Sequence, residues 1–195
     1  TRNSVEIIGN RLDDNVVNDG KLVTVSTNAG KDTVSNSGSQ VSIDGGADSD
    51  NISNSGSQVS IEGGEGADTI SNSGLYDTIN GGDGDDVINL SGGYRNVISG
   101  GEGDDSIYIS PTEKEVLIKH SAGDGNDYIN GFNETSTLQI GDGTATFSRE
   151  LHYSDGVLDY IVITSGEDKI TIDGEASLLS DISIFGVGEG KQVEN

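Results

Sequence analysis

Aspartates and glycines recur along this chain at the spacing of a nine-residue unit. Three copies are nearly identical: GGEGADTIS at 63–71, GGDGDDVIN at 81–89 and GGEGDDSIY at 100–108. The glycines at positions 1, 2 and 4 permit backbone angles that turn carbonyl oxygens toward one point, and the aspartate at position 6 adds charged oxygen. Oxygen ligands without sulfur or imidazole suit a hard cation, and a flexible cage of about six to eight oxygens suits Ca²⁺ better than Mg²⁺.

The aspartates at position 6 define a period for most of the chain. They are 18 residues apart at first, and 19 and then 22 residues apart near the end: Asp14, Asp32, Asp50, Asp68, Asp86, Asp105 and Asp127. One period therefore holds two nine-residue units. In the other unit, NSGSQVSI at 36–43 returns at 54–61, with Val41 and Val59 in place of aspartate. We expect one corner of each period to carry metal ligands and the opposite corner mostly not to.

This arrangement predicts an all-β fold. The template G-G-x-G-x-D-x-U-x is typical of a parallel β-helix that binds Ca²⁺. We predict a right-handed parallel β-roll (β-solenoid) of 18-residue coils, each with two strands of about three residues, stacked about 4.8 Å apart. The apolar residues at position 8 are expected to point into the coil: Ile70, Ile88 and Ile107. A structural ladder of amides is expected at the opposite corner, formed by Asn36, Asn54 and Asn72.

The repeats resemble the RTX (repeats-in-toxin) hemolysin-type calcium-binding repeats of secreted bacterial proteins, over about residues 9–131. The resemblance implies that each Ca²⁺ lies between two corners one coil apart. Both position-6 aspartates bind it, together with carbonyls from positions 2 and 4 of one corner and positions 1 and 3 of the next. It implies three well-formed sites, from the pairs Asp50 with Asp68, Asp68 with Asp86, and Asp86 with Asp105. The other residues that it implies at these corners are Gly46, Asp48, Gly63, Gly64, Glu65, Gly66, Gly81, Gly82, Asp83, Gly84, Gly100, Gly101, Glu102 and Gly103.

The corner AGDGNDYIN at 122–130 loses only its first glycine, and the resemblance implies a fourth site there, between Asp105 and Asp127. Ala122 and Asp124 are its further candidate ligands. The four extra residues of the 22-residue spacing are expected around Pro111–Lys114, because proline cannot donate to a strand ladder and belongs in a bulging loop.

Corners nearer the N-terminus depart further from the pattern. At 27–35 (TNAGKDTVS) both leading glycines are gone and Lys31 adds positive charge, so a site shared by Asp32 and Asp50 is doubtful. Asp77 is the only aspartate at position 6 of the opposite corner, where a weak extra site is an alternative to a structural role. We expect about three to five Ca²⁺ ions in all.

Composition makes the fold dependent on these ions. The chain has 34 acidic and 10 basic residues, a net charge of −24, 31% hydrophobic residues, 30 glycines and no cysteine. Low hydrophobicity with high charge does not offset the entropy cost of ordering, and no disulfide can staple the fold. We therefore predict that the repeats fold when Ca²⁺ binds. The negative charge argues against nucleic acid and anionic membranes as partners, and no apolar run is long enough to span a membrane.

Past the repeats, alternating apolar residues predict strands at 137–140, 157–163, 169–172 and 182–185, with a helical turn at 176–179. A solenoid needs its open end covered, so we divide the chain into a roll, residues 1–131, and a continuous β-rich cap, residues 132–195. The N-terminal stretch 5–8 is predicted to be the first strand, and the lack of any methionine is expected of a piece of a longer chain.

No enzymatic chemistry is predicted. His120 and His152, the two histidines, have no metalloprotease motif or nucleophile elbow nearby and are expected to be surface or packing residues. The leading function is a calcium-binding structural module of a secreted or cell-surface bacterial exoprotein, such as an adhesin. The resemblance implies export by type I secretion. We expect the module to be a monomer. One alternative is the accessory C-terminal module of a secreted protease, lipase or polysaccharide epimerase. Another is a module that binds an extracellular polysaccharide or surface receptor, although aromatic residues make up only 5% of the chain.

Overall fold

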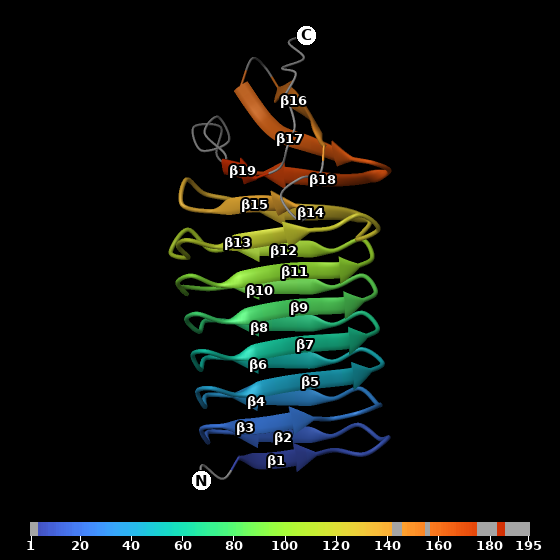
Figure 1. Ribbon diagram of the computed structural model, residues 1–195, viewed down its shortest axis with the longest axis vertical. Coiled ribbons are helices and arrows are strands. Elements are labelled where there is room, and N and C mark those ends of the chain that lie inside the picture. Colours follow the sequence, from blue (N-terminus) through green and yellow to red (C-terminus); the bar gives the residue numbers. More distant parts are fainter. Residues whose placement is uncertain (1–3, 142–145, 155–156, 175–182, 186–195) are drawn as a thin grey trace.

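Two sheets, parallel throughout the coils, face each other and are joined at both edges by loops (Figure 1). The computed structural model describes residues 4–141, 146–154, 157–174 and 183–185. Sheet A contains β1 (Val5–Ile8), β3 (Val23–Ser26), β5 (Ser42–Ala47), β7 (Ser60–Glu65), β9 (Thr78–Asp83), β11 (Val97–Glu102), β13 (Leu117–His120), β15 (Thr137–Ile140) and β19 (Ser183–Phe185). Sheet B contains β2 (Asn15–Asn18), β4 (Thr33–Asn36), β6 (Asn51–Asn54), β8 (Thr69–Asn72), β10 (Val87–Leu90), β12 (Ser106–Ile109), β14 (Asn126–Asn130), β18 (Asp168–Asp173), β17 (Val157–Ser165) and β16 (Ser148–Ser154).

The predicted parallel β-roll is confirmed. The chain alternates between the sheets, so each strand pairs with the strand one coil away, for example Ile70 with Ile88 and Ile88 with Ile107. We call the loops that lead from sheet A to sheet B the aspartate corner and those that return from B to A the asparagine corner. The strands have four to six residues in most coils rather than the three expected, because the position-1 to position-3 residues of the aspartate corner continue the sheet A strands.

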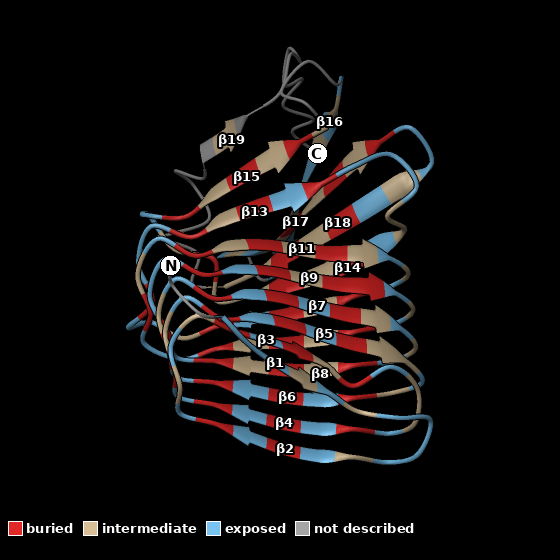
Figure 2. Ribbon diagram, turned by 60° about the horizontal axis from the view of Figure 1, so that its bottom comes forward, coloured by how far each residue is buried: buried red, intermediate tan, exposed pale blue. Residues whose placement is uncertain are grey.

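The core is a stack of apolar residues, of which some strands contribute one and others two. Alternation along each strand buries one side chain and exposes the next, as the burial colours of Figure 2 show. Fully buried isoleucines continue from coil to coil: Ile43, Ile61, Ile79, Ile98 and Ile118 in sheet A, and Ile52, Ile70, Ile88, Ile107 and Ile129 in sheet B. Burying each such side chain contributes about 1.5 to 3 kcal/mol.

The predicted amide ladder is confirmed at the asparagine corner and is longer than predicted. Asn18, Asn36 and Asn54 each donate from Nδ2 to the Oδ1 of the asparagine in the following coil, at 2.7 Å, and the ladder ends at Asn72. The next residue in this register is Leu90. Stacked amides satisfy one another inside the roll, so buried polar side chains here carry little unsatisfied hydrogen-bonding capacity.

The position of the extra residues corrects the sequence prediction. The core residues Ile98 and Ile107 are 9 apart in sequence, whereas Ile107 to Ile118 and Ile118 to Ile129 are each 11 apart. Two extra residues therefore lie at the asparagine corner around Pro111, as expected, and two lie at the aspartate corner before Asp127. The prediction that all four surround Pro111 was wrong, because the spacing of aspartates counts both corners of a coil together.

At the C-terminal end the roll continues into an antiparallel meander. β14 pairs in parallel with β18, which pairs in antiparallel with β17, and β17 with β16. The strands predicted at 137–140, 157–163 and 169–172 are present, whereas β16 was not predicted. The helical turn predicted at 176–179 lies outside the described residues. Because parallel pairing continues through β15, the division at residue 131 stays a prediction.

The described part of the chain is made of strands and loops, and it contains no helix long and apolar enough to cross a membrane.

Candidate metal centre

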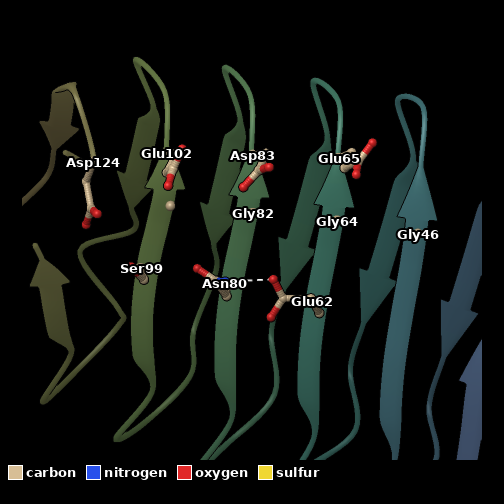
Figure 3. A pocket seen from close by; sticks show the side chains of 11 residues that line it. Gly46, Glu62, Gly64, Glu65, Asn80, Gly82, Asp83, Ser99, Glu102 and Asp124 are labelled. Carbon is tan, nitrogen blue, oxygen red and sulfur yellow. Dashed lines mark hydrogen bonds between the residues drawn. The ribbon is translucent and has the colours of Figure 1, made fainter.

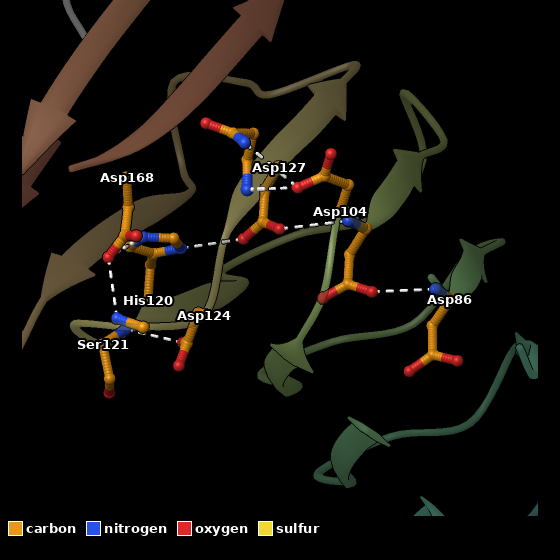
Figure 4. A network of polar contacts seen from close by, with 10 residues as sticks. Asp86, Asp104, His120, Ser121, Asp124, Asp127 and Asp168 are labelled. Atoms are coloured by element: carbon orange, nitrogen blue, oxygen red, sulfur yellow. Dashed lines mark hydrogen bonds and ion pairs between the residues drawn. The ribbon is translucent and has the colours of Figure 1, made fainter. Parts of the chain in front are cut away.

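From Asp32 to Asp127, each position-6 aspartate of the aspartate corner is buried and bonded to the coil before it. The backbone N–H of Asp50 donates to Oδ1 of Asp68, that of Asp68 to Oδ1 of Asp86, and that of Asp86 to Oδ1 of Asp105, at 2.7 to 2.8 Å. The bond from Asp105 to Asp127 is longer, at 3.2 Å. Figure 4 shows the last part of this column. One oxygen of each carboxylate from Asp32 to Asp127 therefore holds two coils in register.

In all of these carboxylates but that of Asp127, the second oxygen has no partner among the described residues. This is true of Oδ2 in five successive coils: Asp32, Asp50, Asp68, Asp86 and Asp105. A buried acceptor without a partner costs about 1 to 3 kcal/mol, and more when it is charged. Five such oxygens in one column mark a place where the protein presents acceptors for something other than its own donors.

The position-1 glycines border the same space. A Cβ built on Gly45 would lie 2.5 Å from Oδ2 of Asp50 and against the carbonyl oxygen of Gly63 in the next coil. A Cβ built on Gly63 or Gly81 would clash with the equivalent two atoms, the aspartate Oδ2 of its own coil and the position-1 carbonyl oxygen of the next. We call the space between the unpartnered Oδ2 of one coil and the position-1 carbonyl of the next a cage. Any side chain at position 1 would enter it.

Glycines at positions 2 and 4 give the loop its turn. Gly82 and Gly84 have φ of 118° and 127°, which side chains rarely tolerate, and Gly82 stacks directly on the Gly64 carbonyl. The position-4 N–H then donates to the position-3 carbonyl of the next coil, as from Gly84 to Glu102 at 2.7 Å. Asp48 adopts φ of 75° at position 4, so the corner with this substitution keeps the left-handed turn.

Burial makes the charged form of these carboxylates costly. Burial raises the pKa of Asp50 to about 6 and the pKa values of Asp86 and Asp105 to about 7. Repulsion from the neighbouring carboxylates contributes to each increase. The pKa of Asp68 is also raised by burial. A divalent cation in the cages would reverse this balance and favour the ionised form. Paired carboxylates and backbone carbonyls form an all-oxygen donor set, which fits Ca²⁺.

Carboxylates at position 3 point away from the cages. Glu65, Asp83, Glu102 and Asp124 line an open groove of about 390 Å³ on the outer side of the corner (Figure 3). Glu65, Asp83 and Glu102 are exposed, so their side chains are solvated charges, while the carbonyls of Asp83 and Glu102 accept the N–H of Gly66 and Gly84 in the preceding coil. Among the described residues, no three His, Cys, Asp or Glu side chains gather to hold a metal, so carbonyls must complete any site.

Strand register corrects the alignment of the last corner. Ser99 pairs with Lys119, so His120, rather than Ala122, follows at the place that Gly100 takes one coil earlier. Ala122 is exposed in the two-residue insertion. Asp124 and Gly125 keep their predicted places, because the Gly103 N–H donates to the Asp124 carbonyl at 2.9 Å. No sequence feature pointed to His120, since its position depends on where the insertion lies.

The asparagine corner satisfies most of its own polar groups, Asn72 Nδ2 being an exception. Asp77 is buried, yet its Oδ1 accepts the Val59 N–H at 2.8 Å and its Oδ2 accepts from Asn54 Nδ2 at 3.0 Å. Asn96 Nδ2 donates to the Gly74 carbonyl and to a Glu113 carboxylate oxygen. Asparagine amide groups therefore occupy the place at this corner that corresponds to a cage at the aspartate corner.

Comparisons with known proteins confirm the resemblance seen in the sequence. The family described as RTX calcium-binding nonapeptide repeat (4 copies) matches residues 76–94 and 91–108, which include the cages of Asp86 and Asp105. No curated protein matches the sequence. Among solved structures, extracellular lipase LipA from Serratia marcescens is similar with a TM-score of 0.42 and 14% identity, over 94% of this chain. The chain spans 40% of that lipase.

Proposed function

We propose that this chain is a calcium-dependent folding module of a secreted or cell-surface bacterial protein. In this function the RTX repeats bind Ca²⁺ in the cages of the aspartate corner, and the bound ions hold the coils together. The module has no catalytic role of its own. Its work is to give a highly acidic, glycine-rich segment a fixed shape outside the cell.

The observation that carries the proposal is the column of unpartnered carboxylate oxygens. Each Oδ2 from Asp50 to Asp105 faces a cage whose position-1 residue is glycine, with no side chain to fill it. The ligands proposed for each ion are the two aspartates of adjacent coils and the carbonyls of positions 1 to 4. In the central coils these are Asp68 and Asp86 with the loops that begin at Gly63 and Gly81.

The electrostatics explain why the ion should be required. Two unit charges about 4 Å apart repel by about 4 kcal/mol at an effective dielectric of about 20. Repeated along a column of buried aspartates, this repulsion is comparable to the whole stability of a domain, about 5 to 15 kcal/mol. Each bound divalent ion removes one such repulsion and adds favourable ligation. Folding and binding are therefore coupled.

The extracellular setting is supported by the affinity class of such sites. Extracellular calcium modules commonly have dissociation constants of about 10⁻⁴ to 10⁻³ M, so they are empty at cytosolic Ca²⁺ and filled outside. A chain that stays unfolded inside the cell and folds outside suits export in the unfolded state. The net charge of −24 also keeps such a chain soluble before it folds.

A calcium titration followed by circular dichroism tests the proposal. The β signal should be largely absent in excess chelator and should rise cooperatively with Ca²⁺, with much weaker recovery in Mg²⁺ at equal concentration. Isothermal titration calorimetry on the same sample gives the stoichiometry. A full β signal in chelator, or a folding transition unaffected by Ca²⁺, would contradict the proposal.

A further inference from the structure

We infer that the side chain at position 1 decides whether a coil can take an ion, and that His120 and Thr27 close the two ends of the cage row. This inference rests on the proposed function, because it assigns limits to the same column of calcium sites. It concerns residues of this chain that depart from the repeat pattern, so it adds to what the repeats themselves imply.

His120 occupies the cage position of the last coil. It follows Lys119, which pairs with Ser99, and so stands where Gly100 stands one coil earlier. A Cβ on Gly100 would meet Oδ2 of Asp105, and in the next coil the imidazole does meet the corresponding oxygen: His120 Nδ1 lies 2.8 Å from Oδ2 of Asp127 (Figure 4). His120 is 1% exposed, so its ring fills this space.

The strand that covers this coil completes the enclosure. Asp168, at the start of β18, places Oδ2 3.9 Å from His120 Nε2 and accepts the Gly123 N–H at 2.8 Å. The imidazole therefore lies between two carboxylates from adjacent coils, as a metal ion would in the cages before it. Oδ2 of Asp127 has a protein partner, whereas Oδ2 of Asp105 has none among the described residues.

Thr27 occupies position 1 at the other end of the row, beside Oδ2 of Asp32, which has no partner among the described residues. Ser26 pairs with Asp44, so Thr27 stands opposite Gly45 at position 1. Its side chain is fully buried, and Oγ1 donates to the Gly45 carbonyl at 2.6 Å. That carbonyl is the position-1 oxygen that would border the cage of Asp32. The hydroxyl and methyl of Thr27 therefore take up the room in which an ion would lie.

Between these two residues every position 1 is glycine: Gly45, Gly63, Gly81 and Gly100. The open cages are therefore those of Asp50, Asp68, Asp86 and Asp105. In the first coil position 1 is also a glycine, Gly9, but Oδ2 of Asp14 already accepts the Asn10 N–H at 2.7 Å, so it is not presented to an ion. Removing either side chain leaves the carboxylates of that coil in place, since they come from other residues. A glycine at position 120 or 27 should therefore open one more calcium site.

Native mass spectrometry in saturating Ca²⁺ tests this inference. His120→Gly and Thr27→Gly should each bind one ion more than the wild type, and the double variant two more. His120→Gln and Thr27→Ser are the matched controls; each keeps a polar side chain in the cage and should bind the wild-type number. Circular dichroism in saturating Ca²⁺ establishes that each variant is folded.

The outcomes separate this inference from the proposed function. A wild type that binds no Ca²⁺ overturns the proposed function. A wild type that binds Ca²⁺ while the folded glycine variants gain no ion overturns the inference alone. If His120→Gly does not fold, the number of ions bound by Thr27→Gly tests the inference, because both residues are assigned the same role. An extra ion in either glutamine or serine control would also overturn the inference.

Discussion

The carboxylate of Asp68 accepts the backbone N–H of Asp50 through Oδ1 at 2.7 Å, while its Oδ2 has no partner among the described residues. One side chain thus does two things. Its first oxygen fixes the register of neighbouring coils, and its second is presented to a cage. In the proposed function stacking and ligation share the same residue, so a bound ion would stabilise the geometry of its own site, and we expect cooperative folding along the column.

Asp86→Ala should weaken calcium-dependent folding more than Asp127→Ala does. Oδ1 of Asp86 accepts the Asp68 N–H, and Oδ2 of Asp86 borders a cage. In contrast, Oδ2 of Asp127 is already bonded to His120. Losing Asp86 therefore disturbs two neighbouring sites and losing Asp127 one. The Ca²⁺ midpoint measured by circular dichroism should rise severalfold more for Asp86→Ala. Equal midpoints for the two variants would contradict a shared ligand at Asp86.

Much of this fold was predictable because its pattern is local. Aspartate spacing, the three near-identical nonapeptides and the repeated NSGSQVSI segment predicted the β-roll, its core isoleucines and the amide ladder. The buried role of His120 was not predictable, because it depends on an insertion whose corner the aspartate spacing does not reveal. β16 was missed because the antiparallel meander has no glycine code, and its residues, including Glu150 and His152, alternate weakly between exposed and half-buried.

Gly81→Ala should remove one calcium ion and destabilise the roll. A Cβ at this position would lie against Oδ2 of Asp86 and the carbonyl of Gly100, both of which border the cage. Gly20→Ala is the control, since its nearest atoms are Val23 Cγ2 at 3.1 Å and Asn18 Oδ1 at 3.2 Å, away from the aspartate corner.

The stoichiometry by calorimetry should fall by about one ion for Gly81→Ala and stay unchanged for Gly20→Ala. An unchanged number of ions in folded Gly81→Ala protein would show that position 1 does not border the site.

Asn54→Ala should destabilise the roll without changing the number of bound ions. Asn54 donates to Asn72 and accepts from Asn36 in the amide ladder, so its loss leaves buried amide groups unsatisfied. The cost should be about 2 to 6 kcal/mol, at about 1 to 3 kcal/mol for each of the two groups that lose a partner. Urea unfolding in saturating Ca²⁺ measures the loss of stability, and calorimetry measures the ions. A lost ion would mean that the asparagine corner also takes part in binding.

Asp77→Val should stabilise the protein more at pH 7.5 than at pH 4.5. Burial, with the negative charge of Glu113 adding to it, raises the pKa of Asp77 from 3.8 to about 6. A carboxyl group whose pKa is raised by folding binds its proton more tightly in the folded state, so its contribution to stability is full below about pH 4 and is lost as the pH rises through about 6. Valine already occupies the same register at Val41 and Val59, so the substitution suits the corner.

The difference in free energy of unfolding between Asp77→Val and the wild type should therefore grow in favour of the variant between pH 4.5 and pH 7.5, by up to about 2 to 3 kcal/mol, since one pKa unit corresponds to about 1.4 kcal/mol. Saturating Ca²⁺ in every sample removes the shared pH dependence of ion binding from this difference. A constant difference across the range would show that Asp77 is already ionised without cost inside the roll, held by its bonds from Asn54 and Val59.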